Sequence, residues 1–176
     1  MLLENTAQQA IDLLKKFNAS DYEISLSSSS GVSTAVRLGQ VETLEYHLDK
    51  SFDINVYFGN AKGHASSVDL SAAGILNTIE SACQIAKYTQ PDPFNGLAPK
   101  ELMAFEVPDL NMYHPWDLDP EQSIDLATRC EAQALSHTDI SNSDGAEVSS
   151  HQGESLYANS KGMMNRHKGA RHSLSC

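Results

Sequence analysis

Cysteine is scarce in this chain of 176 residues, and the three copies that occur form no recognisable motif. Cys83, Cys130 and Cys176 are odd in number, have no Cys-x-x-Cys spacing, and lack a nearby histidine at metal-ligand intervals. The N-terminus lacks a basic segment followed by a long apolar run, and the longest apolar runs are too short to cross a bilayer. These absences argue against a disulfide framework and a membrane partner, and they favour a reducing cytoplasm.

Basic residues are also in the minority. Twelve lysines and arginines stand against 23 aspartates and glutamates, which gives a formal net charge of −11. Because binding to a phosphate backbone depends on cationic contacts, nucleic acid is not expected as a partner. The local basic run at residues 161–172 contains no aromatic residue to stack on a base, so it is interpreted as a solvated pair of strands.

The composition that remains is typical of a globular protein. The chain is 40% hydrophobic and 20% charged, which indicates neither a disordered segment nor a membrane protein. A domain of this length buries roughly 70% of the surface that its unfolded chain exposes. The length therefore predicts a single domain that spans residues 1–176.

Three segments have the apolar spacing of an amphipathic helix. The first is residues 5–17, where apolar side chains recur at intervals of three and four. The second follows Ser71, whose side chain can cap it, and stops before Pro91, which cannot donate a backbone hydrogen bond. The third follows the capping residue Asp119 and extends through Leu135.

Short alternating segments separated by turns predict the strands, with Gly31 interpreted as one of the turns. The expected strands are residues 22–27, 32–38, 41–48, 52–58, 64–68, 140–143, 146–152, 154–159, 162–166 and 170–175. The turns between them are too short for crossover helices, which indicates antiparallel pairing. The sequence thus predicts an α+β fold with a mostly antiparallel sheet, built from two helix-then-meander halves with helices packed on one face.

Residues 90–119 are different in character, and we call them the strap. They contain five of the six prolines and little periodicity, but also many apolar side chains. Such a segment is too apolar to stay in solvent, so its apolar side chains are expected to be docked on the domain. They are Phe94, Leu97, Leu102, Phe105, Val107, Leu110, Met112 and Trp116.

Residues with chemical potential are present, but not in catalytic patterns. The seven histidines include no His-Glu-x-x-His pair, and the closest two, His167 and His172, are expected on a solvated strand and turn. The serine clusters lack a nucleophile elbow, and Asp117 and Asp119 precede a helix, where capping is the favoured role. No catalytic residue, cofactor-binding residue or metal ligand is therefore expected in residues 1–176.

Seven motifs distributed over most of the chain resemble the PmbA/TldE branch of the TldD/PmbA family. They are Gly39-Gln-Val-Glu42, Gly63-His-Ala-Ser-Ser-Val-Asp-Leu-Ser71, Ala86-Lys-Tyr-Thr-Gln-Pro-Asp-Pro93, Pro108-Asp-Leu110, His114-Pro115, Asn159-Ser-Lys-Gly162 and Arg171-His-Ser-Leu-Ser175. Family members are more than twice as long and continue into a β-rich C-terminal half. The resemblance therefore implies that this chain is the N-terminal domain of a longer protein.

The resemblance also implies a function. The TldD branch carries a His-Glu-x-x-x-His zinc motif that the TldE branch lacks, and the two form a heterodimeric peptidase in which an unfolded peptide pairs with a strand edge. By this resemblance, the chain is part of a metal-free accessory subunit that shapes the substrate cavity and binds a zinc-bearing TldD-like partner. Two alternatives stay open: a peptidase in its own right with its metal site in the missing half, or a protein-binding modulator of a topoisomerase.

Overall fold

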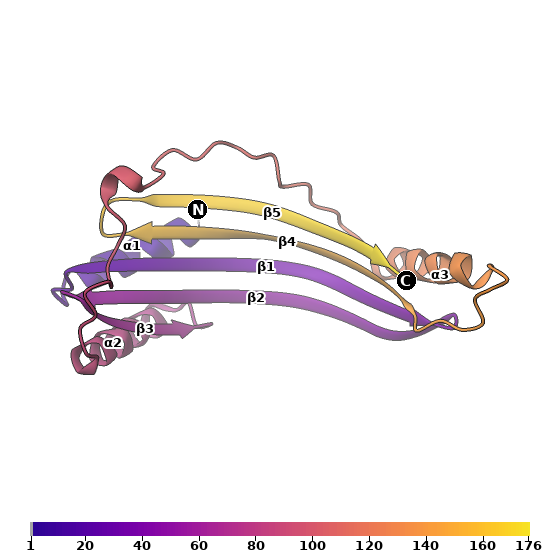
Figure 1. Cartoon of the computed structure of the whole chain (residues 1–176), viewed down its shortest axis with the longest axis horizontal. Coiled ribbons are helices and arrows are strands. Elements are labelled where there is room, and N and C mark those ends of the chain that lie inside the picture. Colours follow the sequence, from indigo (N-terminus) through magenta and orange to yellow (C-terminus); the bar gives the residue numbers. More distant parts are fainter. Residues whose placement is uncertain (1) are drawn as a thin grey trace. The chain divides into compact units, whose positions relative to one another are not determined.

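The computed structural model describes residues 2–176, which form one antiparallel five-stranded sheet and three α-helices (Figure 1). In chain order the elements are α1 (Leu2–Leu14), β1 (Asp21–Arg37), β2 (Gln40–Phe58), β3 (Ala61–Ser67), α2 (Ala72–Tyr88), the short 3-10 helix η1 (Lys100–Leu102), α3 (Pro120–Leu135), β4 (Ala146–Asn159) and β5 (Met164–Ser175). The strand order across the sheet is β3-β2-β1-β4-β5. The predicted α+β class with an antiparallel sheet is confirmed.

The strands are fewer and longer than the sequence predicts. The segments expected at residues 22–27 and 32–38 are one strand, β1, and those at 41–48 and 52–58 are both part of β2. The pairs of segments expected after residue 145 likewise merge into β4 and β5, and no strand forms at residues 140–143. The strand boundaries inside these runs were therefore predicted wrongly.

Gly31 explains one of these errors, because it lies in the middle of β1 and not in a turn. A Cβ atom built on Gly31 would stand 2.2 Å from Nδ1 of His151 and 2.6 Å from the carbonyl oxygen of Ser150. No real Cβ tolerates such contacts. The glycine allows β4 and its histidine ring to approach β1 closely, which is a long-range requirement that resembles a turn signal in sequence.

The contacts divide the chain into two compact units. Unit 1 comprises Met1–Ser28, described from Leu2 onward, with Asp49–Asp109 and Glu154–His167. Unit 2 comprises Ser29–Leu48, Leu110–Gly153 and Lys168–Cys176. The long strands contribute residues to both units. The prediction that residues 1–176 form a single domain stays a prediction.

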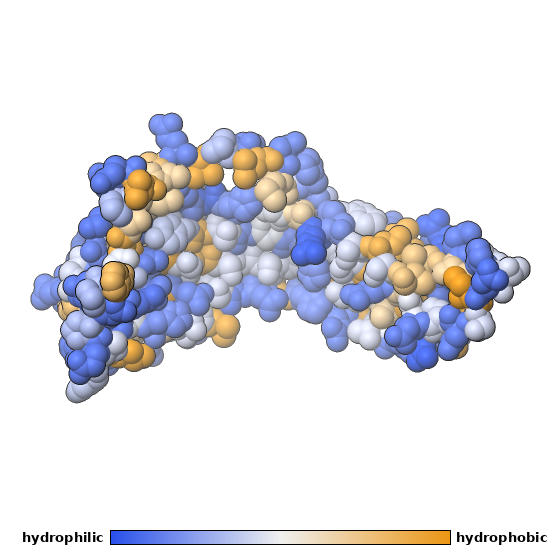
Figure 2. Space-filling view, viewed as in Figure 1, coloured by the Kyte–Doolittle hydropathy of each residue, from blue (hydrophilic) through white to orange (hydrophobic). Residues whose placement is uncertain are grey.

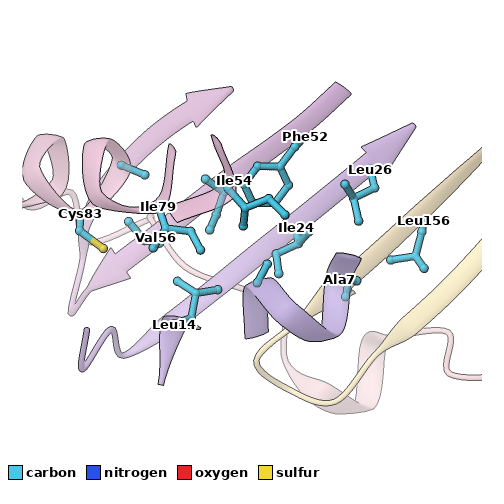
Figure 3. Packing of buried hydrophobic residues seen from close by; sticks show 14 of the residues in the cluster. Ala7, Leu14, Ile24, Leu26, Phe52, Ile54, Val56, Ile79, Cys83 and Leu156 are labelled. Carbon is cyan, nitrogen blue, oxygen red and sulfur yellow. The ribbon is translucent and has the colours of Figure 1, made fainter. Parts of the chain in front are cut away.

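Unit 1 has an extensive apolar core, in which side chains from α1, β1, β2, α2 and β4 converge (Figure 3). Its fully buried members include Leu14, Ile24, Phe52, Ile79 and Leu156. On β1 and β2, buried residues alternate with more exposed ones, so α1 and α2 cover one face of the sheet in this unit. Burial of this surface is the main stabilising term for unit 1.

Helix α2 lies very close to β3 because the strand offers no side chain at the crossing point. A Cβ on Gly63 would stand 2.0 Å from the carbonyl oxygen of Ala82 and 2.6 Å from the amide nitrogen of Ala86. The helix presents Ala82 and Ala86, both fully buried, at this contact. Small residues on both elements thus permit a backbone-to-backbone approach that a larger residue would prevent.

The helix starts agree with the predicted caps. The Ser71 side chain accepts a hydrogen bond from the Gly74 N–H at 3.1 Å, and Asp119 accepts one from the Gln122 N–H at 2.8 Å. Helix α1 begins earlier than predicted and ends at Leu14. Asn18 follows with a φ of 55°, a left-handed conformation that asparagine tolerates and that prevents the helix from continuing.

Unit 2 has a smaller apolar cluster, formed by Val32, Val36, Leu118, Ala127 and Val148. Beside it, two buried hydroxyl groups meet: Thr34 Oγ1 lies 2.7 Å from Ser123 Oγ, which itself donates to the Pro120 carbonyl at 2.9 Å. Since the single hydroxyl proton of Ser123 is used in the second bond, Thr34 is the donor in the first. Polar contacts thus take part in joining α3 to β1.

A carboxylate secures the turn between β1 and β2. Leu38 and Gly39 have φ values of 48° and 72°, as a two-residue type I′ turn requires. Glu131 on α3 is 1% exposed and accepts hydrogen bonds from both turn N–H groups, at 2.8 Å from Leu38 and 2.9 Å from Gly39. These bonds from Gly39 and Leu38 lower the pKa of Glu131 below its ordinary value.

Candidate interaction surfaces

The strap is ordered against the protein, but its apolar side chains are mostly exposed. Phe94 is 96% exposed and Leu102 is 76% exposed, and Phe105 and Trp116 are also exposed. Leu118 is the buried member of the strap. The expectation that these apolar residues are docked is therefore wrong for most of them. The strap is held by another kind of contact.

In unit 1 the strap is held by asparagine side chains and by backbone hydrogen bonds. Asn60 receives a hydrogen bond from the Asp92 N–H at 3.1 Å and donates from its side chain to the Asn95 carbonyl at 3.0 Å. Further along, Asn165 donates to the Ala104 carbonyl at 2.7 Å. Because these bonds use the backbone of the strap, its side chains stay free to face outward.

In unit 2 the strap follows β5, the last strand of the sheet. The Ala170 N–H donates to the Met112 carbonyl at 2.9 Å, and His172 Nε2 lies 2.8 Å from the His114 carbonyl. Ser150 on β4 donates to the Trp116 carbonyl at 3.0 Å. The Trp116 ring meets the His172 ring edge-on, with centroids 5.6 Å apart. This edge of the sheet is therefore partly covered by the chain itself.

Ser150 and His172 form a pair that resembles a nucleophile with its base, but its bonds are structural. Ser150 Oγ lies 3.0 Å from His172 Nδ1 and is almost fully buried. Both groups also contact strap carbonyls, which accept hydrogen bonds and so require the serine hydroxyl and the imidazole Nε2 as donors. The pair tethers the strap to β4 and β5.

A shallow apolar groove lies beside α3 in unit 2, with a volume of about 620 Å³. Figure 2 shows hydrophobic residues gathered over this helix. The groove is lined by Leu126, Arg129, Cys130, Gln133, Ala134, His137, Ile140, Leu174 and Cys176. Two of the three cysteines are among these residues.

The other residues considered from the sequence have ordinary structural surroundings. Three of the four lysines and arginines of the basic run have a partner: Lys161 lies 3.2 Å from Asp21, Arg166 is paired with Glu154, and Lys168 stands 5.2 Å from the ring centre of Tyr113. Cys83 is buried in the core of unit 1, and burial raises the pKa of its thiol. These contacts agree with the interpretation of residues 161–172 as surface strands.

Two features were missed by the sequence analysis. One is the buried carboxylate of Glu131, which shares a face of α3 with Ala127 one turn earlier and was visible as an acidic residue at an apolar position. The other is a stretch of β2 that carries the exposed side chains of Leu44, Tyr46 and Leu48. The sequence showed this alternation but not that the strand lies at an edge.

Within residues 2–176, no group of three or more histidine, cysteine or acidic side chains converges as a metal site. The expectation that this segment holds no metal ligand stays a prediction. Among the same residues, no helix has the length and apolar character needed to cross a bilayer.

Comparison with known proteins gives matches along most of the chain. Residues 22–86 match a family model described as PmbA/TldA metallopeptidase domain 1, and residues 113–176 match one described as PmbA/TldA metallopeptidase central domain. The Metalloprotease PmbA of Escherichia coli O157:H7 is 41% identical over 99% of this chain. A Metalloprotease PmbA homolog from Haemophilus influenzae is 43% identical over the same share. The chain spans 39% of the length of each relative.

Solved structures show the same fold. A Bacteroides thetaiotaomicron protein named as a modulator of DNA gyrase superposes on 97% of this chain with a TM-score of 0.81 and 19% identity. TldE from Thermococcus kodakarensis superposes on 96% of it, with a TM-score of 0.71 and 16% identity. This chain corresponds to 39% and 38% of those two proteins.

Proposed function

Since this chain belongs to the PmbA/TldE family of peptidases, we propose that it is the N-terminal part of a metal-free accessory subunit in a cytoplasmic zinc metallopeptidase complex. Its role is to shape the cavity that receives an unfolded peptide and to bind a TldD-like catalytic subunit. That subunit supplies the zinc ion. Residues 1–176 contribute binding surface and no reacting group.

The strap is the observation that carries this proposal. Its backbone is fixed by hydrogen bonds from Asn60 and Asn165 in unit 1 and from Ala170 in unit 2, while most of its apolar side chains are exposed. A pre-ordered segment binds with a smaller entropy loss than a loose one. Exposed apolar side chains such as Phe105 and Met112 supply the hydrophobic contact that partner surfaces need.

The name of the curated relatives favours a second candidate. They are called metalloproteases, which fits a peptidase in its own right whose metal site lies outside residues 1–176. The presence of His-Glu-x-x-x-His in the remaining sequence of the full-length protein separates the two candidates. If the motif is present, the second is correct.

The test is co-purification of the full-length protein with its zinc-bearing TldD-like relative, followed by metal analysis and a casein digestion assay. We expect a complex with zinc and peptidase activity, while the full-length protein alone holds no stoichiometric zinc and cleaves no casein. Replacement of Leu110 and Met112 by aspartate should reduce recovery of the partner. Val68→Asp is the matched control, because Val68 is also an exposed apolar residue but lies outside the strap. Zinc and activity in the isolated protein would contradict the proposal.

A further inference from the structure

The two outer edges of the sheet differ in how they are covered. On β5, the strap accepts the Ala170 N–H through the Met112 carbonyl. On β2, the partner strand β3 pairs with residues Phe52 to Phe58 and goes no further. Residues 40–51 of β2 thus present their outer N–H and C=O groups with no strand beside them in the described part of the chain.

This open edge lacks several of the features that normally keep edges from pairing. Natural edge strands are short, or carry proline, bulges or charged side chains, lysine above all. Residues 40–51 contain no proline and no glycine, and Lys50 is their one lysine, beside three acidic residues. Leu44, Tyr46 and Leu48 share one face of β2 by alternation, and Tyr46 is 67% and Leu48 74% exposed. An edge of this length and character is expected to have a partner strand.

The order of side chains along the edge points to the identity of that partner. If a second copy of the strand runs antiparallel with Tyr46 opposite Tyr46, then Leu44 faces Leu48 and Glu42 faces Lys50. On the opposite face of this strand pair, Glu45 lies opposite His47. The central apolar residues thus meet one another and Glu42 meets Lys50, while Asp49 faces the neutral Thr43; the two-fold axis repeats each pair.

Neighbouring registers of the strand pair are less favourable, because they place like charges opposite each other. A register centred on Glu45 places this glutamate opposite its own copy, and one centred on His47 places Glu45 opposite Asp49. Like charges directly opposite each other destabilise a strand pair. We propose that the chain forms a homodimer in which the open edges of two β2 strands pair antiparallel, centred on Tyr46, to give one continuous sheet. This inference does not depend on the proposed peptidase function.

Charge reversal tests the pairing. Lys50→Glu or Glu42→Lys alone places two pairs of like charges in the dimer, and each should raise the dimer dissociation constant about tenfold in sedimentation equilibrium. The double variant with both changes restores opposite charges and should return to within about twofold of the wild type. Lys16→Glu is the control, because it makes the same charge change at an exposed lysine outside β2.

Disulfide trapping tests the register. In a chain with Cys130 and Cys176 replaced by serine, Tyr46→Cys should form a covalent dimer on mild oxidation, since residues directly opposite each other come within disulfide reach. Leu44→Cys and Leu48→Cys should each form no disulfide-linked dimer alone and should cross-link when mixed. A wild-type chain that is monomeric at all concentrations, a dimer that ignores both charge reversals, or a Tyr46→Cys variant that does not cross-link would overturn the proposal. Zinc content and partner recovery measure the proposed function separately.

Discussion

Unit 1 and unit 2 contribute to the same strands but are stabilised differently. In unit 1, large apolar side chains such as Phe52, Ile54 and Ile79 are fully buried between the sheet and two helices. In unit 2, a small cluster of three valines, one leucine and one alanine is accompanied by buried polar groups, namely Thr34, Ser123 and Glu131. Apolar burial stabilises without directional requirements, whereas each buried polar group needs a correctly placed partner.

The difference predicts how each unit responds to change. Unit 1 should lose stability in proportion to the apolar volume removed from its core. Unit 2 should be most sensitive to changes that leave a buried donor or acceptor unpaired. Trp116, the single tryptophan of the chain, lies in unit 2, so its fluorescence reports on that unit. Hydrogen exchange resolves the two units separately.

The largest effect is expected from Phe52→Ala in unit 1. Phe52 is fully buried, so its truncation removes a large apolar surface and leaves a cavity, with a loss of about 3–5 kcal/mol in the free energy of unfolding. Urea denaturation followed by circular dichroism measures the loss. The control is Val148→Ala in unit 2, which removes less volume and should cost about 1–2 kcal/mol by the scale of buried methylene groups. Equal losses of stability at the two positions would contradict the expected difference between the cores of unit 1 and unit 2.

A smaller loss, about 1–3 kcal/mol, is expected from Gly31→Ala in unit 2. The added methyl group collides with the His151 ring and with the Ser150 carbonyl. His151→Ala removes the ring, so the double variant should recover part of the loss, while the carbonyl contact keeps the rest. Ser29→Ala in the same strand is the control and should stay near the wild type. A stable Gly31→Ala protein would show that β4 can move away from β1 at no cost.

Gly31 also shows which structural features cannot be predicted from the sequence. Helix starts were predictable because a capping side chain such as Ser71 or Asp119 acts on its own first turn. A glycine required by a neighbouring strand has no such local mark, because the strand that approaches it is distant in sequence. Ser33 and His151, which meet across β1 and β4, are 118 residues apart. The class of the fold followed from alternation, but strand length depended on pairing between distant segments.

The candidate surfaces were predictable in composition and not in location. The apolar content of the strap correctly marked it as unusual, but hydrophobicity states only that a side chain favours burial and not which chain covers it. The structure places Phe94 and Leu102 in solvent and holds the strap by backbone hydrogen bonds. The same holds for Leu44, Tyr46 and Leu48, whose alternation predicted a strand but whose edge position follows from the end of β3 at Ser67.

The buried hydroxyl pair of unit 2 provides a sharper test of the comparison. Thr34→Val removes the donor of this pair, and Ser123→Ala removes its acceptor together with the donor to the Pro120 carbonyl. Each change should cost about 1–2 kcal/mol, because it leaves a buried polar group without its partner. When both are changed, neither lacks a partner, and the double variant should lose less than the sum of the single losses. Urea denaturation monitored by Trp116 fluorescence gives the three values. Strict additivity would mean that the two hydroxyls do not interact.

The smallest effect on stability is expected from a fall in pH, and it depends on the carboxylate of Glu131. The hydrogen bonds from Gly39 and Leu38 hold the pKa of this carboxyl below its ordinary value of 4.5, so the folded state favours the ionised form. The contribution of this carboxylate to the free energy of unfolding is therefore complete above that ordinary value and is lost as the pH falls through the lowered folded pKa.

Glu131→Gln should be less stable than the wild type at neutral pH, and this difference in stability should disappear as the pH falls through the folded pKa. Denaturation midpoints of both proteins, followed by Trp116 fluorescence between pH 7 and about pH 3, measure this gap. Asp125→Asn is the control, because Asp125 is an exposed acid on the same helix and pairs with Arg129 in solvent, where screening makes such a pair worth little. A gap that stays constant with pH would mean that the charge of Glu131 does not secure the turn between β1 and β2.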